Sequence, residues 1–289
     1  MILSGLFFRA VQMSTPLLLG SLGEVLVERT GVMNMAIEGI FLLGAWAGFT
    51  GAYLSGSLLI GFVCAMLTGV LTGALYGWIT VYLKQHQIVT GVALNILAAG
   101  LGIYLYRVLF GVPLLPLTVE SLKPFAVPVL SDLPFIGPVL FRQNVLTYIA
   151  FLAMPAGWWL LFRTRTGLIL RSTGANPEAV DAAGINVERV QFGAVLLSSA
   201  LNGLAGAFYS IGYLGLFSND MIGGRGWIAF ALCFLGNWNP LGALLGALIF
   251  GIADAAAITL QTSGFSLVPN EFLIALPYIL TIVATVLRT

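Results

Sequence analysis

Apolar residues along this chain form long runs that shorter polar stretches separate. A helix that crosses a membrane needs about 20 consecutive, mostly apolar residues. We therefore expect spans at roughly 3–22, 32–53, 56–83, 88–110, 144–163, 190–213, 240–261 and 270–287. The apolar piece 227–235 is shorter and predicts a short or re-entrant helix, and the pattern leaves open whether it crosses fully. The chain is thus predicted to be an all-α, polytopic transmembrane helix bundle with about 8–9 spans.

The composition agrees with a surface that faces lipid. Of the 289 residues, 59% are hydrophobic and only 8% are charged, whereas a soluble domain carries about 25% charged residues. At a mean hydropathy of +1.02, the apolar residues cannot all lie inside one core, so the solvent is a bilayer. The formal net charge of +1 provides no attraction to nucleic acid. Soluble enzymes, nucleic-acid-binding proteins and disordered chains are excluded.

Two polar stretches interrupt what we expect to be a single transmembrane domain over 1–289. The first, 111–143, holds six of the 12 prolines and predicts an extended, irregular loop. The second, 164–189, lies in an arginine-rich region, and such loops face the cytoplasm. Counting crossings from that loop places the proline-rich loop and the N-terminus outside and the C-terminus in the cytoplasm.

Motifs for catalysis are absent from the sequence. There is no G-x-x-x-x-G-K-[ST] phosphate loop, and one histidine cannot form an H-E-x-x-H site. Two isolated cysteines cannot form a zinc cluster. We therefore expect a protein that is not an enzyme and that binds no cofactor or metal of its own. Energy for transport would come from a partner or from an ion gradient.

The polar loop 164–189 contains signals for a short helix. Asn176 is a good N-cap, Pro177 suits the first helical position, and Glu178 places negative charge at the positive end of the helix. Gly184 is a natural residue for the position after the helix. The signals predict a helix of about seven residues.

A helix this short is marginal in water by itself, so another surface must pack against it. Its apolar side chains are Ala179, Val180, Ala182, Ala183 and Ile185. The helix either rests on its own bundle or docks on a soluble partner.

Two motifs now resemble a known family. Glu178-Ala179 followed by Ala182-Ala183-Gly184-Ile185 resembles the coupling-loop motif of ATP-binding-cassette (ABC) importer permeases. Gly23-Glu24, the run from Glu28 to Asn34, and Glu38-Gly39 are similar to the nucleoside and simple-sugar permeases, a branch of the branched-chain amino acid and ribose permease family. The resemblance extends from about residue 16 to residue 276.

The resemblance implies a permease subunit in the bacterial inner membrane. Its implied partners are cytoplasmic ATPases that use ATP and Mg, a second permease subunit, identical or homologous, and an extracytoplasmic solute-binding protein. The implied solute is a nucleoside or a related small solute such as a sugar or a flavin, and a branched-chain amino acid remains open. The residues implied to couple to the ATPase are Gly174, Asn176, Pro177, Glu178, Ala179, Ala182, Ala183, Gly184 and Ile185.

Polar and aromatic residues inside the predicted spans are the candidates for the translocation pathway. A charged side chain at the centre of a span costs about 2.5–3.5 kcal/mol on insertion scales, so it should face the pathway or a partner. The candidates are Asn34, Glu38, Trp46, Tyr76, Asn95, Asn202, Trp227 and Asp254. We interpret Glu38 and Asp254 as the deepest carboxylates.

Each candidate also has a structural interpretation. The amides could bond sugar hydroxyls or base edges, or they could join two helices. The aromatic side chains could stack on a planar ring, or they could pack and anchor at the interface. For Glu38, a structural or gating role at a helix start is favoured over contact with the solute.

Two other functions remain open at this stage. One is an ion-coupled secondary transporter in which Glu38 and Asp254 titrate or bind a cation. The other is a membrane scaffold that transports nothing.

Small residues recur at four-residue spacing, as in Gly44/Gly48 and Gly69/Gly73/Gly77. Such strips allow helix backbones to approach closely in lipid. We favour packing within one bundle over a dedicated dimer interface.

Overall fold

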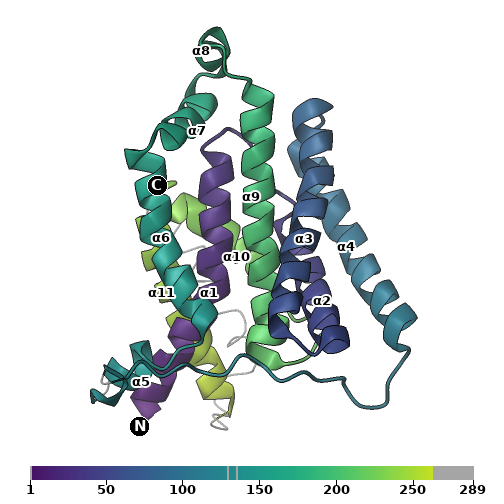
Figure 1. The fold of residues 1–289 in the computed structure, drawn as a ribbon, viewed down its shortest axis with the longest axis vertical. Coiled ribbons are helices and arrows are strands. Elements are labelled where there is room, and N and C mark those ends of the chain that lie inside the picture. Colours follow the sequence, from purple (N-terminus) through teal and green to yellow (C-terminus); the bar gives the residue numbers. More distant parts are fainter. Residues whose placement is uncertain (1, 129, 135, 263–289) are drawn as a thin grey trace.

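The computed structural model describes residues 2–128, 130–134 and 136–262, and over these residues it is helical and contains no strand. Figure 1 shows the arrangement. The first half consists of α1 (Ile2–Glu28), α2 (Ile37–Ser55), α3 (Leu58–Gly77), η1 (Trp78–Tyr82), α4 (Gln87–Phe110), η2 (Leu130–Asp132) and α5 (Ile136–Leu140). The second half consists of α6 (Val145–Arg163), α7 (Arg165–Ala175), α8 (Pro177–Ala182), α9 (Val187–Ala207), η3 (Phe208–Leu214), α10 (Arg225–Leu235) and α11 (Pro240–Thr262).

Within the described residues, seven helices are long and apolar enough to cross a membrane. They are α1, α2, α3 continued by η1, α4, α6, α9 continued by η3, and α11. They coincide with the first seven predicted spans. The predicted span 270–287 lies outside the described residues, so the total of 8–9 spans stays a prediction.

The two polar stretches lie at opposite ends of the bundle (Figure 1). α8 projects beyond the transmembrane helices at one end, and the N-terminus and α5 lie at the other. The prediction of a wholly irregular proline-rich loop was wrong, because the short helices η2 and α5 form within it. The polar loop 164–189 likewise contains a helix that was not predicted, α7, which Thr164 caps by accepting a hydrogen bond from the Gly167 amide at 3.1 Å.

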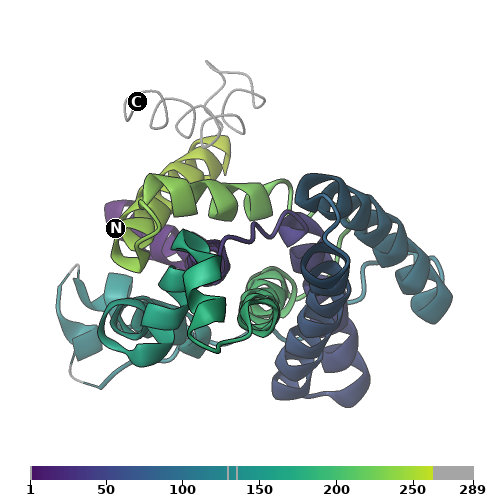
Figure 2. The same ribbon diagram turned by 90° about the horizontal axis from the view of Figure 1, so that it is seen from above.

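α1, α2 and α9 form the buried centre of the bundle (Figure 2). Small residues allow this packing, as the glycine strips predicted. A Cβ added to Gly44 on α2 would lie 2.5 Å from the carbonyl oxygen of Gly203 on α9. The outward faces of α3 and α4 carry many exposed apolar side chains, as expected for helices that face lipid.

The boundary between the first two spans differs from the prediction. α1 continues to Glu28 instead of ending near residue 22, and α2 begins at Ile37 instead of near residue 32. The segment 29–36 between them is non-helical. Backbone polar groups at this depth must find partners within the protein, and side chains from other helices supply them.

α10 is the short helix that the sequence indicated. Its eleven residues extend about 16 Å at 1.5 Å per residue, about half the hydrocarbon thickness of a bilayer. Gly224, which has a φ of +83°, is its N-cap. α10 and α2 therefore both begin inside the bundle.

We predict that Gly44→Ala destabilises the bundle, because the added methyl group would collide with the backbone of Gly203. Overpacking of this kind costs about 1–3 kcal/mol, so the midpoint of thermal unfolding in detergent should fall. Gly100→Ala on α4 is the matched control, because a Cβ there meets open space. An equal effect of the two substitutions would contradict this account of the packing.

Candidate functional site

The short helix α8 has the capping that its sequence predicts. The Asn176 side chain accepts a hydrogen bond from the Ala179 amide at 3.1 Å, and Pro177 occupies the first turn. Gly184 has a φ of +80°, the left-handed conformation expected just after the helix. Asn186 then caps α9 by accepting a hydrogen bond from the Arg189 amide at 2.8 Å. α8 spans six residues, close to the seven expected.

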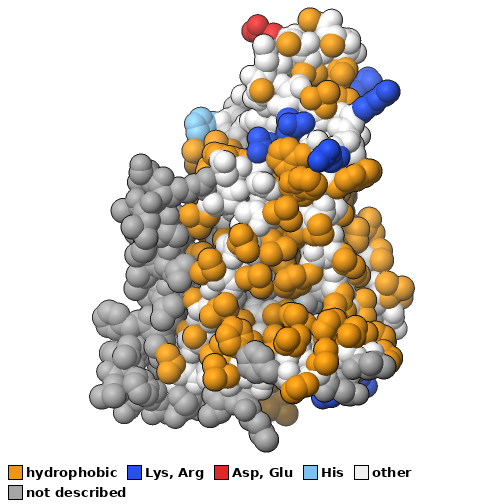
Figure 3. Space-filling view, turned by 90° about the vertical axis from the view of Figure 1, so that its left-hand side faces the viewer, with side chains coloured by type: hydrophobic (Ala, Val, Ile, Leu, Met, Phe, Trp, Pro, Cys, Tyr) orange, Lys and Arg blue, Asp and Glu red, His pale blue; other side chains and the backbone are white. Residues whose placement is uncertain are grey.

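Most of the apolar surface of α8 is uncovered. Val180 is 5% exposed and anchors the helix. Ala179, Ala182 and Ala183 are exposed, whereas Ile185 is half-buried. Figure 3 shows hydrophobic side chains at this tip and Lys and Arg side chains beneath it. α8 thus presents apolar side chains that the described residues do not cover.

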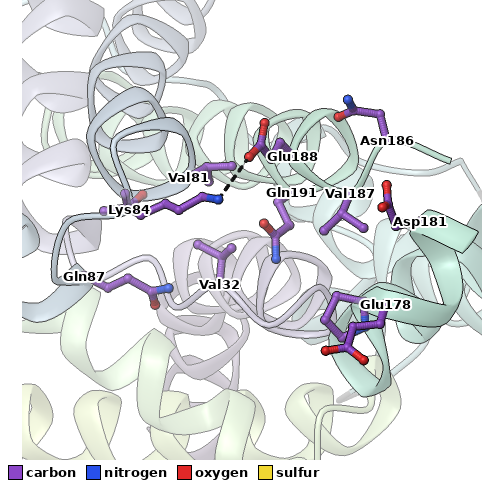
Figure 4. A pocket seen from close by; sticks show the side chains of 12 residues that line it. Val32, Val81, Lys84, Gln87, Glu178, Asp181, Asn186, Val187, Glu188 and Gln191 are labelled. Atoms are coloured by element: carbon purple, nitrogen blue, oxygen red, sulfur yellow. Dashed lines mark ion pairs between the residues drawn. The ribbon is translucent and has the colours of Figure 1, made fainter.

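A cleft of about 560 Å³ lies beside α8. Glu178 and Asp181 of α8, Glu188 of α9 and Lys84 at the turn before α4 surround it (Figure 4). The Lys84 ammonium lies 3.6 Å from the Glu188 carboxylate. Such an exposed pair is weak. The two α8 carboxylates have no ion-pair partner among the described residues, so the cleft is acidic on its α8 side.

An aromatic ring orders two arginines below the tip. The guanidinium carbons of Arg171 and Arg29 lie 5.1 and 5.7 Å from the centroid of the Phe162 ring, within the range of cation–π attraction. Burial, and then repulsion from Arg171, lowers the pKa of Arg29. This group links α6 and α7 to the residue that follows α1.

A buried polar cluster joins α1 to α9. The Glu24 carboxylate accepts hydrogen bonds from the Asn202 amide at 3.0 Å and the Ser198 hydroxyl at 3.2 Å. The Asn34 amide lies 3.4 Å from the Ser198 hydroxyl. All four residues are 0% exposed. One oxygen each of Glu24, Asn34 and Asn202 has no hydrogen-bond partner.

The Glu38 carboxylate joins α2 to α10. Its two oxygens accept hydrogen bonds from the amides of Gly224 and Gly226, each at 2.8 Å. Glu38 lies in the first turn of α2, so it meets the positive ends of two helices. Glu38 therefore stands at a helix start, as expected.

Asp254 pairs with Arg225 at the start of α10. The Arg225 guanidinium lies 3.3 Å from the Asp254 carboxylate, and its carbon lies 5.3 Å from the centroid of the Tyr209 ring. Arg225 is the first residue of α10, so the ion pair ties α10 to α11.

Two other candidates hold the non-helical segment 29–36 in place. Asn95 accepts a hydrogen bond from the Gly39 amide at 2.8 Å and donates one to the Met35 carbonyl at 2.9 Å. The Tyr76 hydroxyl donates to the Met33 carbonyl. Asn95 therefore makes the helix-joining contact that was the structural alternative for the amides, whereas Tyr76 bonds the backbone of segment 29–36.

The two tryptophan candidates stand apart from these contacts. Trp46 is half-buried and its indole N–H has no partner. Trp227 is 38% exposed and lies edge-on to Phe230 at 6.3 Å. The eight pathway candidates thus divide among several contacts and do not converge on one cavity among those described.

Sequence reasoning missed two groups. Glu38 and Asp254 were expected to be the deepest carboxylates, but Glu24 is wholly buried. The second group lies at the end of α1, where the Trp238 indole N–H donates to the Glu28 carboxylate at 2.6 Å and the Arg29 Nε–H donates to the Trp238 carbonyl at 2.9 Å. No local spacing indicates either group, because the partners Asn202 and Trp238 lie 178 and 210 residues away in the chain.

Comparisons with known proteins identify the family of this chain. A family described as "Branched-chain amino acid transport system / permease component" matches residues 6–285. The nucleoside ABC transporter permease protein NupC of Lactococcus lactis subsp. cremoris is 38% identical over 95% of this chain and 89% of its own length. A Haloferax volcanii protein with the provisional designation glucose ABC transporter permease protein TsgC13 is 34% identical over 92% and 81%.

A solved structure shares the fold. It shows, in an inward-facing conformation, an ABC transporter classed as metal-chelate type, and it aligns with a TM-score of 0.51 at 17% identity. The alignment covers 95% of this chain and 83% of the other.

We predict that Asn95→Ala lowers stability without changing the affinity for the transported solute. The substitution leaves the Gly39 amide and the Met35 carbonyl without their partner, and each unsatisfied buried group costs about 1–3 kcal/mol. Thermal unfolding and the KM of uptake measure the two effects. Ser55→Ala, at the exposed end of α2, is the control. A raised KM at unchanged stability would instead make Asn95 a contact of the solute.

Proposed function

Because this chain belongs to the branched-chain amino acid transport system permease family, we propose that it is the transmembrane permease subunit of an ABC importer for nucleosides or sugars. The observation that carries the importer assignment is α8, a capped helix that projects from the bundle with its alanines exposed. A helix this short is not stable alone in water, and a partner surface would cover it.

We propose that α8 docks on a cytoplasmic ATPase, which would bind and hydrolyse ATP with Mg. This places the α8 end of the bundle in the cytoplasm and the N-terminus outside, in a bacterial inner membrane. A second permease subunit, identical or homologous, would complete the pathway, and an extracytoplasmic binding protein would deliver the solute. Displacement of α8 on ATP binding would tilt the helices and open the pathway to alternate sides.

The buried polar cluster supports a hydroxyl-rich solute. Three of its oxygens, on Glu24, Asn34 and Asn202, are acceptors without a donor, and a ribose or hexose ring carries hydroxyl donors. The cluster lies at the contact of α1 with α9, so these acceptors become accessible only when that contact opens. The greater similarity to the nucleoside permease favours a nucleoside over a sugar.

We predict that combining Glu178→Arg with Gly184→Leu abolishes both ATPase binding and uptake. The first change reverses charge on α8, and the second places a side chain at a φ of +80°, where L residues are strained. Co-purification of the ATPase and solute uptake by cells are the measurements. Glu120→Arg, on an exposed side chain of the proline-rich loop, is the control. Normal assembly and uptake in the double variant would exclude α8 as the docking element.

The energy source separates an ABC importer from an ion-coupled transporter. Uptake into proteoliposomes that contain the whole complex should require ATP and Mg. It should continue when ionophores collapse the ion gradients. Uptake that stops with the gradients while ATP is present would favour ion coupling instead.

We predict that a purine nucleoside competes for uptake and that glucose does not. Uptake of a labelled purine nucleoside should fall at least about tenfold in a hundredfold excess of the unlabelled compound, as expected for one saturable site. The same excess of glucose or of a branched-chain amino acid should leave uptake unchanged. Inhibition by glucose alone would assign the complex to sugars.

A further inference from the structure

The short helix α10 is held at both ends by residues from one stretch of chain, 28–38. Glu38 binds its first turn, and Glu28 and Arg29 bind the turn that follows its last residue. The helix between these contacts has eleven residues. Its buried face includes Ile228, Ala229, Leu232 and Cys233, so neighbouring helices confine it sideways.

The contact at the start of α10 leaves little freedom of movement. Both oxygens of the Glu38 carboxylate are engaged, each at 2.8 Å from a backbone amide. A Cβ added to Gly226 would lie 2.6 Å from one of these oxygens, so only glycine allows this approach. Charge-assisted hydrogen bonds of this kind are among the stronger polar contacts in proteins.

The contact at the other end is built on an unusual turn. Asn237 and Trp238 have φ values of +58° and +51°, which are uncommon for residues other than glycine and need support from their surroundings. The Arg29 guanidinium supplies it by donating to the carbonyls of Trp238 at 2.9 Å and Asn237 at 3.4 Å. The Trp238 indole N–H donates to Glu28.

The stretch 28–38 also contacts α7, the helix that precedes α8. Gly174, near the end of α7, packs directly on the backbone of Arg29 and leaves no space for a side chain. The Gln191 amide of α9 donates to the Thr30 carbonyl at 3.0 Å. Movement of α7 and α8 would therefore displace Arg29, which holds the end of α10.

We propose that α10 is a strut that passes displacement of α8 to the start of α2, with Glu28, Trp238 and Glu38 as positioning residues at its two ends. The proposal rests on the proposed function of α8 as the ATPase contact. A hydrogen-bonded helix fixed at both ends moves as a unit, so a push on the turn at 237–238 displaces Glu38 and α2.

The test uses the purified complex of this chain with its ATPase and second permease in proteoliposomes. Uptake and ATP hydrolysis are measured together and expressed as solute transported per ATP. Trp238→Phe removes the indole N–H at one end, Glu38→Gln removes one acceptor at the other, and the third variant combines them. Trp159→Phe is the control, because this tryptophan is 60% exposed on α6.

We expect each single substitution to retain ATPase assembly and hydrolysis and to lower solute per ATP by about tenfold. The combined variant should transport as much solute per ATP as the worse single variant. A strut that is disconnected at one end no longer transmits displacement, so disconnecting its other end causes no further loss. Effects at separate and independent sites would multiply instead.

Glu28 provides a conservative rescue. Glu28→Gln keeps an acceptor for the Trp238 indole and should transport within about twofold of the unaltered complex. Glu28→Leu removes the acceptor and should match Trp238→Phe.

Three results would contradict the proposal that α10 is a strut. They are multiplicative losses in the combined variant, equal losses in the two Glu28 variants, and failure of Trp238→Phe to assemble with the ATPase. A wrong proposed function would be recognised by a different result. The variant that combines Glu178→Arg with Gly184→Leu would then assemble with the ATPase and transport normally.

Discussion

Two helices of this bundle, α2 and α10, begin inside it, and the Glu38 carboxylate joins their first turns. α2 and α10 both start at depth, with the free backbone amides and partial positive charge of a helix N-terminus. Water would normally satisfy those amides, but the interior of a bilayer has none. Glu38 lies in the first turn of α2 and accepts two amide hydrogen bonds from the start of α10. Without this acceptor, the amides of Gly224 and Gly226 at the start of α10 would be buried without a partner.

The same requirement explains the positions of Tyr76 and Asn95. The non-helical segment 29–36 exposes backbone groups that Tyr76 and Asn95 engage from α3 and α4. The polar groups of Tyr76 and Asn95 are therefore engaged in hydrogen bonds that maintain the fold. A polar residue in a transmembrane helix is expensive, and hydrogen bonds within the protein offset that expense. One oxygen each of Glu24, Asn34 and Asn202 lacks such a partner.

Rigid and exposed parts are separated along the molecule. The centre is packed through close backbone contacts, such as Gly44 on α2 against Gly203 on α9, where even a methyl group does not fit. At the tip, α8 is anchored by Val180 and exposes its alanines. Displacement of a sparsely packed tip costs little, whereas a dense interior transmits displacement with little compression. This arrangement suits a subunit that receives mechanical work at one end.

The sequence alone determined the elements whose causes are local. Runs of about 20 apolar residues specify spans because backbone hydrogen bonds in lipid must be satisfied within the helix, and the first seven predicted spans correspond to helices. Asn176, Pro177 and Gly184 act within one turn of chain, so the limits of α8 were predictable. The motifs around Glu28 and Glu178 were sufficient to indicate the family.

Only the tertiary structure decided which residues meet. The partners of Glu38 lie 186 and 188 residues away in the chain, and those of Glu24 lie 174 and 178 residues away. No local spacing encodes such pairs. The prediction ended α1 too early for the same reason. Glu24 can be buried inside this helix because Asn202 and Ser198, which lie far away in the chain, donate hydrogen bonds to it.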